Sequence, residues 1–336
     1  MRPAGRVNDF LRIATVFVVA VGVWIPSSGA YGQSGPALLP YEAADDWARL
    51  PGGRSWGAPT GVEMDPDQES LWVLERCGDF NGPGCAESDV APILKFDSSG
   101  KLVQSFGAGM FLYPHGLHVD HEGNVWVTDG RGESGKGHTV LKFNPEGELV
   151  LTLGQPGVAG EGPNTLNRPS DVAVARNGDI FVADGHSGMD TNMRIVKYSK
   201  DGTFIKEWGK KGTAPGELDG AHGLAFDSRG RLFVADRGNR RIQIFDQDGG
   251  FIDAWTQFGS PSGLFISPDD ILYVADLAEG IRIGSAKDGS LSAFIMAPVP
   301  ESGTARVAES VAVDAQGTLY AGENAGMKLL KFAVRP

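Results

Sequence analysis

A short pattern recurs six times along this chain and constrains its fold more than any other feature. Each copy holds two brief runs of alternating apolar residues separated by a turn, as in "PHGLHVDHEGNVWVTDG" (114–130) and "AHGLAFDSRGRLFVADR" (221–237). The other copies begin at residues 59, 169, 261 and 308. Period-two alternation rich in Val, Leu, Phe and Trp predicts strands, and the glycines between the runs suit hairpin turns.

A second hairpin follows the first, as in "ILKFDSSGKLVQSFG" (93–107) and "IQIFDQDGGFIDAWT" (242–256). Four strands per copy, repeated every 40–55 residues, are typical of a β-propeller. We therefore predict an all-β fold, a six-bladed β-propeller over 59–336. A two-sheet sandwich does not explain such regular recurrence.

The sixth copy is incomplete, because the chain ends at "MKLLKFAVRP" (327–336) with no room for a fourth strand. An unpaired blade edge invites aggregation. The N-terminal segment 33–58, through "YEAADDWARL" (41–50), is expected to supply the missing strand and close the ring. A loose N-terminal arm is the alternative.

Residues 1–32 have the pattern of a secretory signal peptide. Arginines precede the apolar run "IATVFVVAVGVWI" (13–25), and small residues follow it. The run is short for a membrane span, so we expect a secreted or periplasmic protein without a stable span, an uncleaved anchor being the alternative. The formal charge of −12 argues against nucleic acid as a partner.

Cys77 and Cys85 are the two cysteines of the chain, in "RCGDFNGPGC" (76–85). In an exported protein, a pair this close is expected to form a disulfide that holds a loop. A metal or redox site of the Cys-x-x-Cys type would need tighter spacing.

One position of the repeat carries the functional signal. The first strand of each propeller blade lines the central channel, so equivalent residues at its start form a ring around one mouth. That ring reads, in chain order, Thr60, His115, Ser170, His222, Ser262 and Glu309. Alternate blades lie about 120° apart, and His115, His222 and Glu309 are therefore predicted to converge on the axis. Two histidines and a carboxylate with an open position are a ligand set of catalytic zinc sites.

Three other histidines lie outside this symmetry. His118 is in a predicted strand, whereas His121 and His138 are in predicted loops or turns. We interpret all three as structural or surface residues.

The repeats resemble NHL-type propellers. Within that group, "YPHGL", "DGH…RIVKY", "AHGLAF" and "ADRGNRRIQIF" are similar to peptidyl-α-hydroxyglycine α-amidating lyase, and the resemblance covers residues 55–334. In that family, three histidines at the mouths of alternate blades hold zinc. A tyrosine and two arginines surround a substrate that breaks into a peptide amide and glyoxylate.

The resemblance implies roles for individual residues. His115 and His222 match two zinc ligands, and Arg237 and Arg76 match the substrate arginines. Glu309 stands in place of the third histidine, and a carboxylate can also bind zinc. His186 stands in place of the tyrosine, where an imidazole could accept a proton.

Each of these assignments has an alternative. Arg237 could form an ion pair within its own blade, and Arg76 could be a solvated loop residue. The family also has a structural calcium, bound by an aspartate directly after the third histidine. Ser310 stands at that position, so calcium is not expected.

Three functions follow from these observations. The first is a secreted, metal-dependent, lyase-like enzyme that acts on a small hydroxylated or carboxylated molecule or peptide. The second is a non-catalytic propeller that binds a peptide or glycan, because propellers host many functions. A lactonase-type hydrolase is third, since its calcium would call for a ring rich in carboxylates and amides.

Overall fold

A computed structural model describes residues 37–39, 41–44, 46–80, 84–188, 191–296 and 308–334. The predicted signal peptide, residues 1–32, lies outside these ranges. Within them, no helix has the length and apolar character needed to cross a bilayer.

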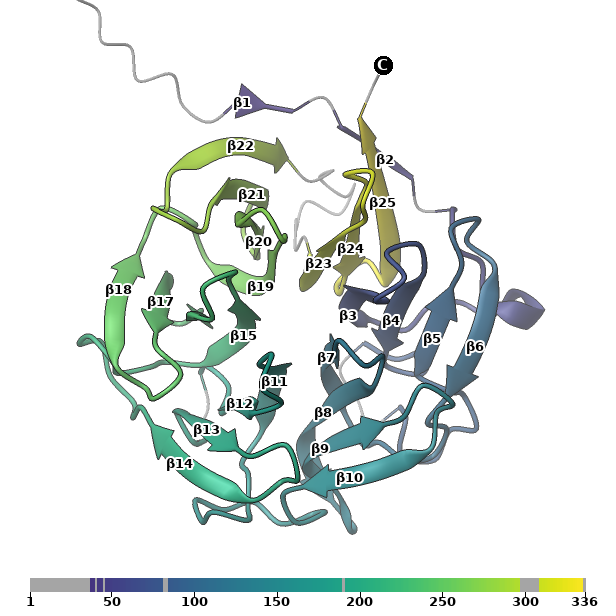
Figure 1. The fold of residues 1–336 in the computed structure, drawn as a ribbon. Coiled ribbons are helices and arrows are strands. Elements are labelled where there is room, and N and C mark those ends of the chain that lie inside the picture. Colours follow the sequence, from purple (N-terminus) through teal and green to yellow (C-terminus); the bar gives the residue numbers. More distant parts are fainter. Residues whose placement is uncertain are drawn as a thin grey trace, which may run out of the picture. The chain divides into compact units, whose positions relative to one another are not determined.

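The described chain forms six sheets arranged as the blades of a β-propeller, which confirms the predicted fold class (Figure 1). Blade 1 comprises β3 (Pro59–Met64), β4 (Leu71–Glu75), β5 (Ile93–Phe96) and β6 (Leu102–Phe106). Blade 2 comprises β7 (Pro114–Val119), β8 (Val125–Glu133), β9 (Lys136–Phe143) and β10 (Leu149–Leu153). Blade 3 comprises β11 (Pro169–Val174), β12 (Ile180–Asp184), β13 (Arg194–Tyr198) and β14 (Phe204–Trp208). Blade 4 comprises β15 (Ala221–Phe226), β16 (Leu232–Asp236), β17 (Arg241–Phe245) and β18 (Phe251–Trp255). Blade 5 comprises β19 (Pro261–Ile266), β20 (Ile271–Asp276), β21 (Gly280–Ser285) and β22 (Leu291–Met296). Blade 6 includes β23 (Ser310–Val313), β24 (Leu319–Glu323) and β25 (Lys328–Val334).

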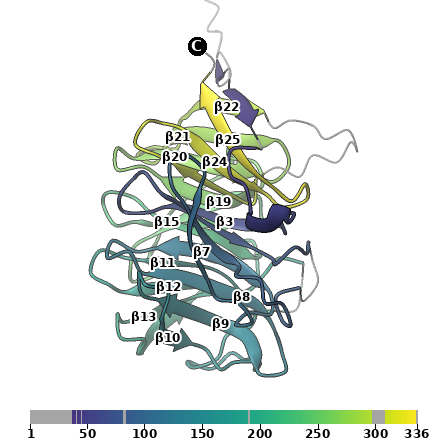
Figure 2. The ribbon, with the colours of Figure 1, turned by 90° about the vertical axis from the view of Figure 1, so that its right-hand side faces the viewer.

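The strands of each blade run outward in chain order. Strands β3, β7, β11, β15, β19 and β23 surround the centre, and β6, β10, β14, β18 and β22 lie at the rim (Figure 1). Figure 2 shows the same blades from the side, with the inner strands following one another through the middle. The second hairpins turn at glycines with positive φ, such as Gly100 (80°) and Gly147 (89°), a conformation that glycine adopts without strain.

The ring is closed by the N-terminal segment, as predicted. Strand β2 (Tyr41–Ala44) pairs antiparallel with β25 and is the fourth strand of blade 6. The sequence did not predict β1 (Ala37–Leu38), which adds to β22 of blade 5 in parallel. A single 3₁₀ turn, η1 (Pro51–Gly53), follows β2 before the first blade begins.

The hydrophobic core is divided among the seams between neighbouring blades. One cluster joins blades 3 and 4 through Phe181 and Phe245, and another joins blades 1 and 2 through Trp72 and Phe143. Every seam has a cluster of this kind, including the one between blades 6 and 1, where Tyr320 packs with Phe96 and the partly buried Trp47. Each blade is therefore stabilised by both of its neighbours, because its apolar faces are covered only within the ring.

The second strand of each blade has a buried carboxylate at or near its end; in β8 it is Asp129, four residues before the last residue of the strand. In five blades this carboxylate accepts a hydrogen bond from a backbone N–H just before the first strand. The pairs are Glu75 with Gly57, Asp129 with Leu112 and Tyr113, Asp184 with Asn167, Asp236 with Asp219, and Asp276 with Ser260. Since the ring residue follows this N–H by two or three positions, the carboxylate fixes where the ring residue begins.

In blade 4 this carboxylate, Asp236, is fully buried and has several partners. Its Oδ2 accepts from Arg241 Nε at 2.8 Å, from Asn239 Nδ2 at 2.8 Å and from Gln243 Nε2 at 3.0 Å, and its Oδ1 accepts from Asp219 N at 2.7 Å. Asp184 with Arg194 and Asp276 with Arg282 repeat the ion pair in blades 3 and 5.

Replacement of this carboxylate is expected to destabilise the fold. Asp236→Ala leaves Arg241 and a backbone N–H without their acceptor, and should lower the free energy of unfolding by about 3–5 kcal/mol. Asp248→Ala, whose side chain is 84% exposed, is the matched control and should change it by less than about 0.5 kcal/mol. Urea unfolding followed by tryptophan fluorescence measures both. Equal effects of the two substitutions would contradict the role of the buried carboxylate.

A histidine and a carboxylate meet inside the channel, below the ring. His118 Nδ1 lies 3.0 Å from Glu63 Oε1, so His118 is a structural residue, as expected. Burial alone would lower the pKa of His118, but Glu63 outweighs burial and raises it, with smaller contributions from Asp171 and Asp120. The ion pair therefore forms when His118 is protonated.

This pair is expected to make stability depend on pH. Because the pKa of His118 is raised on folding, its contribution is fully present below the unfolded value of about 6.5 and is lost as pH rises through the folded value. Urea unfolding from about pH 6 to pH 9 should therefore show a smaller decline for Glu63→Gln than for the unaltered protein. An equal decline in both proteins would contradict the assignment.

Candidate functional site

The six ring residues predicted from the repeat lie together, as that alignment requires. Five are the second residue of the innermost strand of their blade, and Glu309 directly precedes β23; all six line one cavity inside the channel. All of them are buried, with exposed fractions from 0% for Ser262 to 6% for Glu309. In blades 1 to 5 the buried carboxylates fix this position, and in blade 6 the backbone N–H of Glu309 donates to the carbonyl oxygen of Gly322.

Hydrogen bonds set which nitrogen of His115 and His222 faces the axis. His115 Nδ1 lies 2.8 Å from the carbonyl oxygen of Ser170, and His222 Nδ1 lies 3.3 Å from that of Ser262. A carbonyl can only accept, so His115 Nδ1 carries the hydrogen and its neutral ring presents a lone pair at Nε2. His222 Nδ1 also lies 3.2 Å from the Ser262 hydroxyl, which can donate, so His222 can carry its hydrogen on either nitrogen.

Glu309 faces both of these nitrogens. Its Oε1 lies 3.2 Å from His222 Nε2 and 3.9 Å from His115 Nε2. His222 Nε2 is buried, and no described group makes a hydrogen bond of good geometry with it. With its hydrogen on Nε2, His222 donates to Glu309; with its hydrogen on Nδ1, the two facing atoms are both acceptors and repel each other unless a cation lies between them.

His186 joins the same cluster from the loop after β12. The ligand nitrogens of His115, His186 and His222 all lie within 4.8 Å of one another. His186 Nδ1 lies 3.1 Å from the carbonyl oxygen of Ser187, so its Nε2 also presents a lone pair. The resemblance implied a place for His186 beside the substrate. In the structure its ring centre lies 5.4 Å from that of His115 and 5.3 Å from that of His222.

Arg237 connects His186 with Glu309. Its Nη2 donates to His186 Nε2 at 3.0 Å, and its Nη1 lies 3.6 Å from Glu309 Oε1. Of the carboxylates considered as alternative partners, Asp236 is paired with Arg241, and the neighbouring carboxylate that Arg237 contacts is Glu309. Arg237 therefore points into the channel mouth.

The site favours neutral histidines beside an ionised carboxylate. Burial, then His222 and Arg237, lower the pKa of His186 to about 3. Burial and the neighbouring cationic groups also lower the pKa values of His115 and His222. Burial alone would raise the pKa of Glu309, but His222, Arg237 and His115 outweigh it and hold this pKa well below its usual value.

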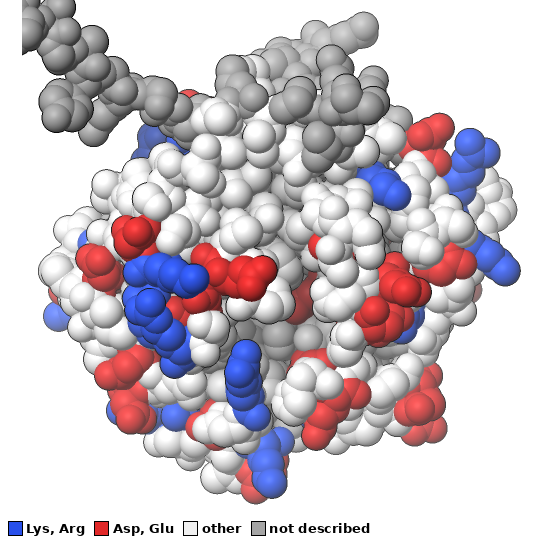
Figure 3. Space-filling model, turned by 45° about the horizontal axis from the view of Figure 1, so that its top comes forward, with Lys and Arg blue, Asp and Glu red and all other residues white. Residues whose placement is uncertain are grey.

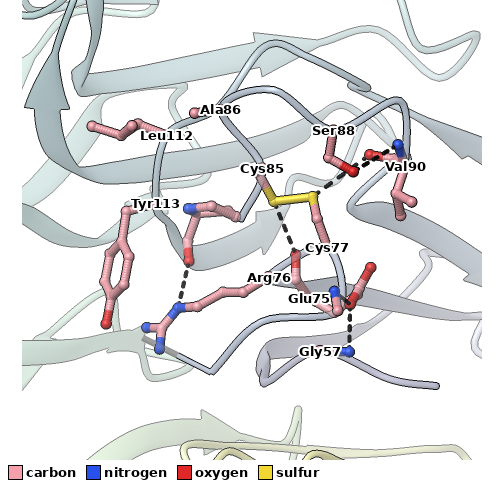
Figure 4. Close-up of a disulfide and its surroundings, with 12 residues drawn as sticks. Gly57, Glu75, Arg76, Cys77, Cys85, Ala86, Ser88, Val90, Leu112 and Tyr113 are labelled. Atoms are coloured by element: carbon pink, nitrogen blue, oxygen red, sulfur yellow. Dashed lines mark hydrogen bonds between the residues drawn. A yellow bond between two sulfur atoms is a disulfide. The ribbon is translucent and has the colours of Figure 1, made fainter. Parts of the chain in front are cut away.

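Arg76 is buried, so the alternative of a solvated loop residue is wrong. It is 3% exposed, and Figure 4 shows it beneath the disulfide loop with its guanidinium group beside Tyr113. Its Nη1 donates to the carbonyl oxygen of Phe80 at 2.8 Å, and its guanidinium carbon lies 3.9 Å from the centre of the Tyr113 ring. The predicted disulfide, Cys77–Cys85, is present and holds the loop that contains Phe80.

Most of these groups line one open cavity of about 390 Å³ at the channel mouth, whereas His222 lines the cavity inside the channel. His115, His186 and Glu309 are at its base, and Arg76, Arg237, Tyr113 and Phe80 are among its walls. Figure 3 shows acidic and basic side chains mixed over one face of the molecule, and the face is hollowed near its middle. The cavity therefore combines possible metal ligands with two cationic groups that suit a carboxylate.

Tyr113 is the wall residue that sequence reasoning missed. It directly precedes Pro114 in "YPHGL", a stretch that was noted for its histidine. Its backbone N–H is bound by Asp129, and the guanidinium carbons of Arg76 and Arg131 lie 3.9 Å and 3.8 Å from its ring centre. Its place two residues before the ring residue His115 could have identified Tyr113 as part of the site. The repeat does not require an aromatic residue at this position.

Comparisons with known proteins agree with this architecture. The NHL repeat family model matches residues 166–198 and 218–245, in blades 3 and 4. NHL repeat-containing protein 3 of Mus musculus is 37% identical over 232 residues, which cover 66% of this chain and 62% of that protein. Peptidyl-glycine alpha-amidating monooxygenase B of Xenopus laevis is 31% identical over 311 residues, which cover 82% of this chain and 34% of that protein.

A third relative, peptidyl-alpha-hydroxyglycine alpha-amidating lyase 1 of Drosophila melanogaster, is 38% identical over 204 residues, or 57% of this chain and 34% of that protein. The chain thus spans less than two thirds of each of these relatives. Among solved structures, a gluconolactonase of Xanthomonas campestris has a TM-score of 0.60 at 18% identity, covering 90% of this chain and 98% of that one, which supports the fold alone. The chain is a six-bladed propeller that contains NHL repeats and is similar in sequence to amidating lyases.

Proposed function

We propose that this protein is a secreted, zinc-dependent, lyase-like enzyme that acts at the channel mouth on a small hydroxylated and carboxylated substrate, such as an α-hydroxyglycine peptide. The supporting observation is the cluster of His115, His186 and His222, whose ligand nitrogens lie within 4.8 Å of one another, with Glu309 Oε1 3.2 Å from His222 Nε2. The lowered pKa of His222 keeps its ring neutral, which is the form that binds a metal ion.

The proposed metal centre uses His115, His222 and Glu309, as the repeat predicts, with His186 as a further ligand. The pKa of His186, lowered to about 3, makes it a weak proton acceptor near neutral pH, whereas a neutral imidazole suits a metal. For this reason we favour ligation over the proton transfer expected from the sequence. Zinc, when bound, would supply a Lewis acid that polarises a substrate oxygen.

Arg237 and Arg76 are proposed to hold the substrate carboxylate. Both line the cavity, and a guanidinium group binds a carboxylate through two parallel hydrogen bonds. On substrate binding, Arg237 would give up its hydrogen bond to His186 and donate to the substrate carboxylate instead. Tyr113 and Phe80 would cover the bound substrate and exclude water, which strengthens these charge-assisted bonds.

The metal centre predicts stoichiometric zinc. The purified protein should contain about one zinc ion per chain, and the double variant His115→Ala, His222→Ala should lose it because two ligands are removed. His121→Ala is the matched control, since His121 is exposed in a hairpin turn outside the site. Elemental analysis by mass spectrometry measures the metal, and circular dichroism checks folding. Zinc retained in a folded double variant would contradict the proposed ligands.

The proposed chemistry predicts release of glyoxylate from an α-hydroxyglycine peptide. Arg237→Gln should lower kcat/KM about 10- to 100-fold, because a charge-assisted contact with the substrate carboxylate is lost. The substitution should leave zinc content unchanged. Liquid chromatography of the peptide amide and glyoxylate measures both products. If the purified protein contains zinc but releases no glyoxylate, the α-hydroxyglycine peptide is not its substrate.

A non-catalytic binding propeller is the second candidate. The observation that favours it is the similarity to NHL repeat-containing protein 3, whose name includes no enzymatic activity. It would share the metal site but release no product from the peptide. The product assay above therefore separates the two candidates.

A further inference from the structure

A second cavity adjoins the candidate site on its blade 2 side. It has a volume of about 300 Å³ and is lined by Leu112, Arg131, Gly132, Glu133, His138 and Arg168. Four of these residues belong to the β8–β9 hairpin, which extends beyond the repeat through the pairs Gly132–Gly137 and Glu133–Lys136. The repeat pattern did not predict this extension.

Arg168 is a cation without a compensating anion. Its Nε is buried and has no hydrogen-bond partner, and in the part of the chain that the structure describes its guanidinium group forms no ion pair. Burial and the neighbouring Arg131 lower the pKa of Arg168. A partly buried positive charge beside another positive charge is costly unless an anion completes it.

His138 adds a neutral donor to the same cavity. Its Nδ1 accepts a hydrogen bond from Arg168 N at 3.1 Å, so the hydrogen of the neutral ring is on Nε2. Burial and Arg168 lower the pKa of His138, which keeps the ring neutral. The ring lies so close to Gly132 that a Cβ there would be 2.0 Å from His138 Cδ2. The cavity thus combines two guanidinium groups with an N–H donor.

Tyr113 connects this cavity with the candidate site. Arg76 and Arg131 both lie over its ring, at 3.9 Å and 3.8 Å, and two guanidinium groups this close cannot share one face. The phenol ring is therefore sandwiched, with Arg76 on the side of the candidate site and Arg131 on the side of the second cavity. Glu133 also lines the second cavity, but its side chain is exposed in the hairpin and can turn to solvent.

We propose that Arg131, Arg168 and His138 form an oxyanion-binding subsite that holds a second acidic group of the substrate. A carboxylate matches this donor set, because it accepts paired hydrogen bonds from guanidinium groups and a further one from the imidazole. The preferred substrate would then have acidic groups on both sides of Tyr113. The substrate part rests on the proposed function, whereas anion binding by the cavity does not.

Sulfate binding tests the cavity by itself. Arg168→Asn removes the charge, and asparagine tolerates the left-handed conformation of this residue, whose φ is 64°. By isothermal titration calorimetry, sulfate should bind the unaltered protein saturably and the variant about tenfold more weakly. Arg229→Gln, an exposed arginine that controls for net charge, should leave sulfate affinity within about twofold.

Other outcomes of the sulfate test would overturn the subsite. These are the absence of saturable binding, an equal loss in Arg168→Asn and Arg229→Gln, or a loss confined to Arg237→Gln. Thermal unfolding of each variant checks its fold. Arg131→Gln provides a second variant with the same expected loss if Arg168→Asn does not fold.

A pair of ligands of equal length tests the substrate part. Glutarate and valerate share a five-carbon chain and differ in one carboxylate, so the unaltered protein should bind glutarate about tenfold more tightly. Arg168→Asn should abolish this preference. Sulfate binding without a glutarate preference would overturn the substrate assignment. A preference that Arg237→Gln leaves intact would instead count against the proposed carboxylate contact in the candidate site.

Discussion

A buried carboxylate at the end of the second strand is the constraint on which the site depends. In five described blades it receives a backbone N–H from the segment that enters the first strand, as Asp236 does from Asp219. The bond fixes the start of that strand, and the ring residue follows two or three positions later. His115 and His222 thus reach the same depth in the channel although 107 residues separate them.

The charges of the site follow from this placement. The ring brings His115, His222 and Glu309 together where water is largely excluded, so attraction and repulsion among them are strong. Glu309 stays ionised and the histidines stay neutral, which is the protonation state that a metal ion requires of its ligands. Arg237 balances part of the negative charge and remains within reach of a substrate carboxylate.

Repetition made most of the architecture predictable from the sequence. Strand alternation gave the blades, and one aligned position gave Thr60, His115 and Glu309 as neighbours, because equivalent residues of a closed ring must meet. Position within the repeat could not predict the contacts of His186 or the burial of Arg76. Both lie next to loops, whose paths depend on side-chain packing rather than on periodicity. His138 lies outside the symmetry, and the sequence therefore indicates a structural or surface residue. The hairpin that carries it departs from the repeat and lines a cavity of its own.

Closure of the ring by β2 and β25 has a consequence for how the protein reaches its folded state. These strands come from opposite ends of the chain, as the pairing of Tyr41 with Val334 shows. Bringing such distant segments together has a large entropic cost, and folds with many contacts of this kind form slowly. Glu309 belongs to blade 6, so its approach to the two histidines requires blade 6 to be synthesised as well as blades 2 and 4. Shortened chains would therefore lack the assembled centre even where most blades are intact.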